Sequence, residues 1–458
     1  MKLLKETIKP IYYRLPPSLR QPYGYAKMYR FYRDAQFWSK ERIRIWQLEK
    51  FKEIVNYAYE NVPGYQQLYK EANICPNDIN NLNDVKNLPF TSKTLIRDNL
   101  SDFTSRSIKK SQIRKCTTGG STGIPFGFYY DKMSSVVEYA FMHNAWATTG
   151  WHINDKGVIL RGGFVGTSDR FFKKTENSRY NLSSYFLTEA NYPSYKSIIK
   201  KTKPTFLHAY PSSASDLARM VIRFEDISNV EFKSIFLGSE NLYKWQNDVI
   251  RKAFPSAKIM CWYGHTERAI WAPYCENIDK YHCCPFYGFT ELLGENNNEI
   301  DKGETGELVG TSFWMKATPF IRYRTMDYAT KGENGCKKCG RNFQLLDSIE
   351  GRLQEIILSK TGRRISMTAI NMHDDTFGEV SQFRFFQDRV GELVILVVPK
   401  DSFTIDSEKK IQNNIGSKLG ADFTLTVKRV EHLAKSVSGK YSFLEQKLNI
   451  EHSDRVVF

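Results

Sequence analysis

Apolar and polar positions along the middle of the chain separate short strands from longer helices. Short apolar runs predict buried strands at residues 158–160, 205–209, 234–237 and 259–262. Helical stretches lie between them, at residues 136–148, 212–224 and 242–253. Strands that alternate with helices form parallel sheets, so this region predicts a doubly wound α/β arrangement.

The patterns on either side differ from this alternation. Before it, helices are expected at residues 36–58, 65–72 and 93–99. After it, residues 299–309 predict a hairpin with Gly303 and Gly306 in the turn. Beyond Arg352, strands at 380–386, 393–398 and 423–430 and a helix at 407–419 indicate a smaller α+β unit. We therefore expect two domains, residues 1–352 and 353–458.

The first 35 residues interleave basic and aromatic side chains. Such a segment can lie at an anionic membrane surface. Prolines at positions 10, 16, 17 and 22 break any long helix here. We therefore favour an irregular arm packed on the main domain, with peripheral membrane contact as the alternative.

The composition narrows the class of protein. The chain has 458 residues, 41% of them hydrophobic, so it is too long for one core and too apolar for disorder. Its net charge of +16 suits anionic partners such as nucleotides, coenzyme A, acidic sugars, nucleic acid or a membrane. The chain has no apolar run of transmembrane length and no signal-peptide pattern, so we expect a cytoplasmic protein.

The sharpest motif is the run TTGGSTGIP at residues 117–125. Glycines and small hydroxyl residues let successive backbone N–H groups cradle a phosphate. No Gly-Lys-Ser/Thr follows, so the run differs from a Walker loop, and a flexible turn is the alternative. The candidate phosphate-binding residues are Thr117, Thr118, Gly119, Gly120, Ser121, Thr122 and Gly123.

A second motif directly follows the strand predicted at 259–262. It consists of Tyr263, Gly264, His265, Thr266 and Glu267. The carboxyl end of a strand is where open α/β sheets bind their ligands. Glu267 is therefore a candidate ligand for a Mg²⁺ ion that bridges phosphates.

Three charged residues farther along the chain extend this set. Asp327 is a candidate acceptor for ribose hydroxyls, and Arg352 could meet phosphate or ribose. Lys440, on a glycine-containing loop, could neutralise charge that develops on an α-phosphate. Each residue alone suits a surface salt bridge or a turn, but in this order the set indicates a nucleotide site.

Cysteine and histidine form a separate constellation. Its members are Cys275, His282, Cys336 and Cys339. This set provides four ligands for tetrahedral Zn²⁺ and leaves no open position, so the metal would be structural. Cys283 or Cys284 could replace one ligand. A group of reduced, buried thiols without metal is the alternative.

As a set, these motifs resemble those of the acyl-activating superfamily of adenylate-forming enzymes. The chain is most similar to the branch of phenylacetate-CoA ligases and CapK capsule-biosynthesis proteins, which it also resembles in AYENVPGY at residues 58–65 and in Leu88-Pro89. The resemblance extends from residue 49 to residue 443. It implies a large adenylation domain followed by a smaller mobile domain, with ATP and Mg²⁺ as cofactors.

The resemblance also implies a role for each motif. The segment 117–123 matches the phosphate loop, and Tyr263 matches the residue that stacks on adenine. Glu267 matches the Mg²⁺ ligand, Asp327 the ribose-binding aspartate and Lys440 the catalytic lysine of adenylation. Further matches are Gly238, Ser239 and Glu240 beside adenine, Arg352 before the hinge, and His208, Tyr210 and Pro211 in the acyl pocket. A purely structural role for His208 remains the alternative.

Two positions depart from the family pattern. Phe126 stands where the phosphate loop usually ends in lysine, and Gln354 stands where the hinge usually has aspartate. In the family the C-terminal domain rotates about this hinge between the two half-reactions. Gln354 therefore leaves rotation of this domain possible but puts the second half-reaction in doubt.

These observations predict ATP-dependent formation of an acyl-AMP from a carboxylic acid, followed by acyl transfer to an amine, hydroxyl or thiol. The CapK resemblance indicates cell-surface polysaccharide synthesis. The alternatives are an aryl-acetate CoA ligase and an enzyme that transfers AMP to a deazaflavin. A basic, zinc-containing nucleic-acid-binding protein is the non-enzyme alternative, although no groove-reading or base-stacking module is recognisable.

Overall fold

The structure is a computed structural model that describes residues 17–118, 126–161, 172–175, 179–184, 186–226, 230–352, 356–361, 364–366, 375–377, 379–434 and 442–448. Five parallel strands form its central sheet within these ranges. The full order is β4 (Phe172–Thr175), β5 (Arg179–Ser183), β3 (Gly157–Arg161), β6 (Phe206–Ala209), β7 (Ser234–Leu237), β8 (Lys258–Gly264) and β9 (Trp271–Pro273), with β4 and β9 antiparallel at the edges. The predicted α/β class and all four predicted strands are confirmed.

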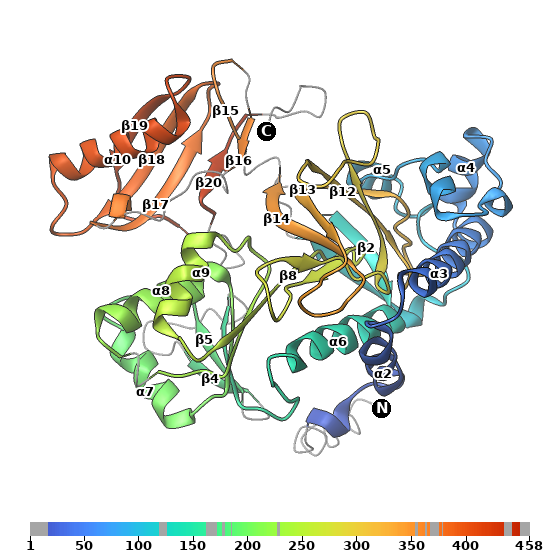
Figure 1. Ribbon diagram of the computed structural model, residues 1–458, viewed down its shortest axis with the longest axis horizontal. Coiled ribbons are helices and arrows are strands. Elements are labelled where there is room, and N and C mark those ends of the chain that lie inside the picture. Colours follow the sequence, from blue (N-terminus) through green and yellow to red (C-terminus); the bar gives the residue numbers. More distant parts are fainter. Residues whose placement is uncertain are drawn as a thin grey trace.

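Helices cover both faces of this sheet. Figure 1 shows α7 (Tyr192–Thr202), α8 (Pro211–Arg223) and α9 (Lys244–Ala253) on one side, and α6 (Lys132–Ala147) on the other. The apolar face of α6 packs inward, where the rings of Trp146 and Phe236 stack with centroids 4.2 Å apart. Helix α7 was not predicted. It begins at Tyr192-Pro193, where proline at the first turn is compatible with a helix.

The predicted arm over residues 1–35 is partly wrong. Residues Tyr25–Ala35 form helix α2, which packs on α6 through stacked rings of Tyr32 and Phe141 at 4.5 Å. The four prolines all precede Tyr25, so they do not interrupt this helix. Packing on the main body is as predicted. Residues 1–16 lie outside the described ranges.

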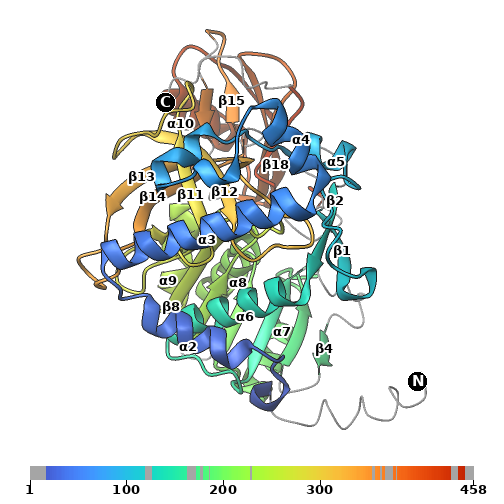
Figure 2. The same cartoon turned by 90° about the vertical axis from the view of Figure 1, so that its right-hand side faces the viewer.

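The helices that precede the sheet follow their predictions closely. They are α3 (Lys40–Asn61), α4 (Pro63–Glu71) and α5 (Lys93–Asp98), with short 3-10 turns at Pro17–Arg20, Pro76–Asp78, Leu82–Asn87 and Lys110–Gln112. Ser92 caps α5 by accepting a hydrogen bond from the Leu95 N–H. Figure 2 shows α3 running across the outside of the molecule, above α2 and α6.

A second, antiparallel sheet lies beside the central one (Figure 1). Its order is β10 (Tyr281–His282), β14 (Gln344–Arg352), β13 (Tyr323–Asn334), β12 (Thr305–Ser312) and β11 (Gly288–Leu293). The hairpin predicted at 299–309 is wrong, because β12 pairs with β11 and β13 instead. Gly306 lies within β12, where a Cβ atom would come within 2.7 Å of the Leu293 carbonyl. Close strand packing, and not a turn, therefore requires that glycine.

A two-stranded hairpin carries the glycine-rich segment. Strands β1 (Ile113–Thr118) and β2 (Phe126–Asp131) are antiparallel, and Thr118 lies opposite Phe126. These two strands flank residues 119–125 in the sequence, which lie outside the described ranges.

The C-terminal part forms an α+β unit with its own core. Its sheet has the order β19 (Thr424–Arg429), β18 (Glu392–Pro399), β17 (Val380–Gln387) and β20 (Leu444–Gln446), next to helix α10 (Ile405–Leu419). Side chains such as Phe385, Ile395 and Ile411 are fully buried in a second apolar cluster. A short hairpin of β15 (Ile356–Leu358) and β16 (Arg364–Ser366) and a 3-10 turn at Asp375–Phe377 precede this sheet.

The C-terminal unit contacts the main body through aromatic rings. Phe443 lies 5.3 Å from Tyr243 and 5.5 Å from Trp245, which stand at the start of α9. The boundary predicted between residues 352 and 353 adjoins residues outside the described ranges and stays a prediction. None of the described helices combines the length and the apolar character needed to cross a membrane.

Candidate functional site

Glu267 lies on the loop that leads from β8 to β9, at the carboxyl end of the parallel strands. Its side chain is buried, with 8% of its surface exposed. The Tyr323 hydroxyl donates to one carboxylate oxygen at 3.0 Å, and His265 Nδ1 lies 3.3 Å from the other. The Ile270 N–H donates to His265 Nε2, which leaves Nδ1 as the nitrogen that donates to Glu267.

These contacts keep Glu267 ionised. Burial raises the pKa of its carboxyl group, but hydrogen bonds from His265, from a backbone N–H and from the Tyr323 hydroxyl outweigh burial. The pKa therefore ends below its ordinary value. A buried carboxylate held in this state suits a divalent cation, because oxygen anions are the ligands that Mg²⁺ prefers.

Asp327 meets the same motif from a different sheet. The Tyr263 hydroxyl donates to its carboxylate at 2.8 Å, and Asp327 is only 6% exposed. Asp327 lies directly opposite Arg352 in the β13–β14 ladder. Three segments predicted to meet at one nucleotide, around residues 263, 327 and 352, are thus neighbours in the structure.

The hairpin of β1 and β2 adjoins this corner. The ring of Phe126 lies 6.3 Å from Phe320, and Phe320 lies 5.0 Å from Tyr323, whose hydroxyl reaches Glu267. Residues 117 and 118 end β1 opposite Phe126, so two aromatic contacts and one hydrogen bond connect this end of the hairpin to Glu267. We refer to Glu267, Tyr323, Tyr263 and Asp327 as the acidic corner.

A second group of predicted residues gathers beyond β6 and β7. His208 lies one residue before the end of β6, Tyr210 precedes α8, and Pro211 begins it. Gly238, Ser239 and Glu240 follow β7. A Cβ atom on Gly238 would come within 2.7 Å of the Trp262 ring, so only glycine allows this close packing. Glu240 accepts a hydrogen bond from the Ser212 N–H at 3.0 Å and thereby caps α8.

Arg161 belongs to this second group and was missed by the sequence analysis. It is the last residue of β3, and its guanidinium contacts His208 at 2.9 Å and Ser239 at 2.6 Å. The signal was present in the sequence, because an arginine directly after an apolar strand lies at the ligand-binding edge of a parallel sheet.

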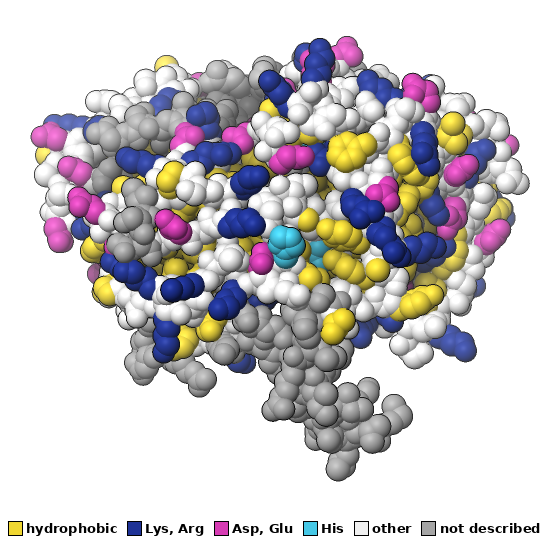
Figure 3. Space-filling view, turned by 60° about the horizontal axis from the view of Figure 1, so that its bottom comes forward, with side chains coloured by type: hydrophobic (Ala, Val, Ile, Leu, Met, Phe, Trp, Pro, Cys, Tyr) yellow, Lys and Arg dark blue, Asp and Glu magenta, His cyan; other side chains and the backbone are white. Residues whose placement is uncertain are grey.

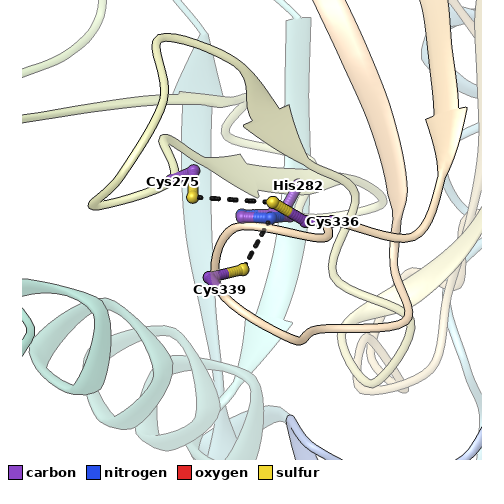
Figure 4. Close-up of side chains that lie close together, drawn as sticks. All are labelled: Cys275, His282, Cys336 and Cys339. Atoms are coloured by element: carbon purple, nitrogen blue, oxygen red, sulfur yellow. Dashed lines mark hydrogen bonds between the residues drawn. The ribbon is translucent and has the colours of Figure 1, made fainter.

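The four predicted metal ligands come together (Figure 4). The ligand atoms of Cys275, His282, Cys336 and Cys339 all lie within 4.8 Å of one another. The sulfur atoms of Cys275 and Cys336 are 3.9 Å apart, and Cys339 Sγ is 3.4 Å from His282 Nε2. A tetrahedral site with zinc–sulfur bonds of about 2.3 Å requires neighbouring ligands about 3.8 Å apart, so the residues fit zinc.

Cys283 and Cys284 are not part of this group among the described residues. Both are buried in the main core, and burial raises the pKa of each thiol to about 12. They are therefore neutral thiols, and the ligand set is the one first predicted.

Cys275, His282, Cys336 and Cys339, which we call the metal cluster after the single ion that they could bind, join two loops and connect them to the helices. Cys275 precedes β10, and Cys336 and Cys339 lie between β13 and β14. Arg341 binds both carboxylate oxygens of Glu276, at 2.8 and 2.7 Å, and also donates to Gln36 at 2.8 Å. The cluster therefore holds both loops against the corner between α2 and α3.

Comparison with known proteins agrees with this geometry. The structure superposes on 2-hydroxyisobutyryl-CoA ligase in its post-adenylation state with a TM-score of 0.71, 18% identity and 91% of both chains covered. On the thioesterification state of that enzyme the TM-score is 0.59, with 17% identity and coverage of 91% and 92%. These values show a shared fold that includes both parts of the chain.

Comparison of sequences shows which adenylate-forming ligases the chain resembles. Residues 357–447 match the CapK C-terminal domain. Protein CapK of Staphylococcus aureus is 24% identical over 424 residues, 87% of this chain and 88% of its own. Phenylacetate-coenzyme A ligase of Thermus thermophilus is 25% identical over 344 residues, 70% of this chain and 72% of its own. The chain is an adenylate-forming ligase, and it is similar in sequence to CapK and to phenylacetate-coenzyme A ligases.

Several residues assigned to the ligase by motif lie outside the described ranges. They are Gly119, Gly120, Ser121, Thr122, Gly123, Gln354 and Lys440. Of Thr117, Thr118 and Arg352 the structure describes the backbone. Phe443, three residues after Lys440, packs on the start of α9 and so brings the end of the C-terminal unit to the main body.

The positive charge of the ligase is dispersed on the face drawn in Figure 3. Lysine and arginine side chains are scattered there among polar and acidic ones, with apolar side chains between them. A nucleic-acid-binding stripe would instead gather basic side chains along one groove or helix. The dispersed charge on this face fits an enzyme with a well-solvated surface.

Proposed function

We propose that this ligase uses ATP and Mg²⁺ to convert a carboxylic acid to its acyl-AMP and then transfers the acyl group to an acceptor. The observation that carries this proposal is the acidic corner. There two hydrogen bonds, from Tyr323 to Glu267 and from Tyr263 to Asp327, join motifs that are 56 and 64 residues apart in sequence. A shared ligand explains why polar groups from two sheets are buried together at the carboxyl edge of the strands.

Adenylation needs charge neutralisation more than covalent catalysis. An oxygen of the carboxylate attacks the α-phosphorus of ATP and forms the acyl–oxygen–phosphorus bond. The bond from the α-phosphorus to the bridging oxygen breaks, and pyrophosphate leaves with that electron pair. Cations and N–H groups around the phosphates stabilise this charge shift.

The residues divide this task by their chemistry. Glu267, buried and ionised, would hold Mg²⁺, which neutralises phosphate charge when it is bound. Asp327 would accept hydrogen bonds from the ribose hydroxyls, and Tyr263 would stack on adenine. The loop amides of residues 119–123, Arg352 and Lys440 would complete the phosphate contacts. Gly238, Ser239 and Glu240 would line adenine, and His208, Tyr210 and Pro211 would line the acid pocket.

We further propose that residues 353–458 form a lid that carries Lys440 and turns about Gln354. Two observations support a state in which this lid faces the acid and the nucleotide. Phe443 packs against Tyr243 and Trp245 of the main body, and the superposition is closer on a post-adenylation state than on a thioesterification state. Rotation toward the second half-reaction would have to break those aromatic contacts.

The metal cluster supports a structural Zn²⁺ site. Cys275, His282, Cys336 and Cys339 provide the donor set and the spacing, and the closed set of four leaves no position for a substrate. Zinc there would add stability to the loops without entering the reaction.

Our proposals for the acceptor and the pathway rest only on the similarity to known proteins. The similarity to CapK favours an amine, hydroxyl or sugar acceptor in cell-surface polysaccharide synthesis, carried out in the cytoplasm. The N-terminal arm would provide any peripheral contact with the inner face of the membrane. The similarity to phenylacetate-coenzyme A ligases favours coenzyme A as the acceptor, and AMP transfer to a deazaflavin is a third possibility.

A pyrophosphate-exchange screen across carboxylic acids tests the proposal. The purified ligase with ATP and Mg²⁺ should exchange labelled pyrophosphate into ATP only when a suitable acid is present. AMP release that requires coenzyme A would identify a CoA ligase, whereas release with an amine or sugar alone would identify the first acceptor class. If no acid in a broad panel supported exchange, the result would contradict adenylation.

A further inference from the structure

A guanidinium lies over the carboxyl ends of the parallel strands, outside the acidic corner. Arg161 ends β3, and its side chain reaches across β6 and β7 to His208 Nε2 at 2.9 Å and Ser239 Oγ at 2.6 Å. Its guanidinium carbon lies 4.7 Å from the centre of the Tyr210 ring. These contacts hold the guanidinium in one orientation and leave several of its five N–H groups for another partner.

The side chains that contact Arg161 within the described ranges carry no negative charge. His208 is neutral, because burial and the nearby Arg161 and Arg179 charges hold its pKa well below the ordinary value. A neutral imidazole accepts the arginine N–H but brings no negative charge. In the part of the chain that the structure describes, the polar partners of Arg161 are His208 and Ser239. The carboxylate of Glu240, next to Ser239, accepts a hydrogen bond from the Ser212 N–H.

The surroundings of Arg161 are built for a ligand with polar groups. Trp146 and Trp262 flank His208, with ring centroids at 5.2 and 5.7 Å. Trp146 Nε1 and Ser212 Oγ are buried and have no hydrogen-bond partner in the described structure, and their residues are 3% and 4% exposed. A buried N–H or hydroxyl without a partner is unfavourable, so a bound acceptor at this site would stabilise both.

The position of Arg161 separates it from the reacting end of the acid. Ser239, which it contacts, follows β7, the strand next to β8, and Glu267 lies just beyond β8. Neighbouring strands are spaced by about 4.8 Å, so the end of β8 lies one spacing from β7 and two from β6, roughly 5–10 Å. A short acyl chain spans that distance.

We infer that Arg161 determines the acid specificity of this ligase and that the acid carries a second anionic group, a carboxylate, that pairs with the guanidinium. This inference rests on the proposed adenylation. One carboxylate would react at the acidic corner while the other binds the arginine N–H groups side by side. The acid is therefore a dicarboxylic acid, and the aromatic rings cover the chain between its two ends.

The test compares matched acids in pyrophosphate exchange. The probes are succinate, glutarate, adipate and isophthalate, each beside its monoamide, which keeps the shape and removes one charge. The wild-type ligase should prefer at least one diacid over its monoamide by about 100-fold in kcat/KM. Arg161→Gln should remove that preference, Arg161→Lys should keep part of it, and Arg44→Gln, on the exposed face of α3, should leave it unchanged.

The outcomes separate this inference from the proposed function. Exchange that favours singly charged acids, or an Arg161→Gln variant with an unchanged diacid-to-monoamide ratio, would overturn the inference and leave adenylation standing. If none of the acids supported exchange, both adenylation and the inference would be overturned. If a melting curve shows that Arg161→Gln does not fold, the comparison of diacid with monoamide in the wild-type ligase still tests the diacid preference.

Discussion

The acidic corner and the metal cluster are both buried groups of polar side chains, but they differ in what remains to be bound. In the metal cluster, four ligand atoms face one point and leave no open side. In the acidic corner, Glu267 and Asp327 each accept a hydrogen bond from a tyrosine hydroxyl, and each carboxylate has about four acceptor sites in all. The first arrangement suits a fixed ion that stabilises loops, and the second suits ligands that come and go.

This comparison predicts that changes in the two regions separate activity from stability. Substitutions that affect the acidic corner should lower exchange activity and leave the melting temperature nearly unchanged. Substitutions in the metal cluster should do the opposite. The four predictions below run from the largest expected effect on activity to the smallest.

Replacing Lys440 by alanine should reduce pyrophosphate exchange by about 1,000-fold, because a cation beside the α-phosphate is lost where charge develops. The measurement is exchange at saturating ATP, with circular dichroism to verify folding. Lys428→Ala, on exposed strand β19, is the matched control and should keep full activity. Near-normal exchange in Lys440→Ala would remove this lysine from the mechanism.

Replacing Glu267 by glutamine should reduce exchange by about 100-fold and raise the Mg²⁺ concentration needed for half-maximal rate, because a neutral amide holds a divalent cation poorly. A magnesium titration of exchange measures both effects. Glu53, an exposed residue of α3, offers a control. Glu53→Gln should leave both the rate and the magnesium dependence unchanged. An unchanged magnesium dependence in Glu267→Gln would mean that another residue holds the cation.

Replacing Tyr323 by phenylalanine should reduce exchange by about tenfold, because one hydrogen bond to the Glu267 carboxylate is lost while the ring remains. The pKa of Glu267 should rise, because one of the groups that lowers it is removed. The low-pH limb of the exchange profile should therefore move to higher pH. Tyr59→Phe, half-exposed on α3, should shift nothing, and an identical profile in Tyr323→Phe would separate Tyr323 from the site.

Replacing Cys336 by serine should lower the melting temperature by roughly 5 °C and the zinc content toward zero, because one metal–sulfur bond is lost. Exchange per folded molecule should change by less than about twofold, since the closed cluster does not meet substrate. Elemental analysis and a melting curve measure the two quantities. Cys75→Ser, an exposed cysteine, is the control, and a metal-free wild-type protein would dismiss the zinc proposal.

The sequence predicted the central sheet well because each of its strands carries a local signal. The four predicted parallel strands are short apolar runs bounded by polar or turn residues, and burial on both faces explains such runs. The pairing of β12 was mispredicted for the opposite reason. Its partner β11 is separated from it by a connection of eleven residues, 294–304, and no local pattern reports which distant strand completes a pair.

The candidate site shows the same division. Short spacing within each motif marked Glu267, Asp327 and the metal ligands, because chemistry needs particular residue types close together. Arg161 was not predicted because its role depends on contacts with His208 and Ser239, which lie 47 and 78 residues away in the chain. Helix α2 was missed because the prolines before Tyr25 obscured its apolar face.

By itself the sequence determined which residues are candidates for binding phosphate, magnesium, ribose and zinc, since it contains side-chain chemistry and local spacing directly. The tertiary structure alone decided which of them share a site. It placed Tyr323 on Glu267, Tyr263 on Asp327 and Arg161 between His208 and Ser239. The physical reason is that strand order and sheet packing are set by burial summed over the whole core, which no short window of sequence contains.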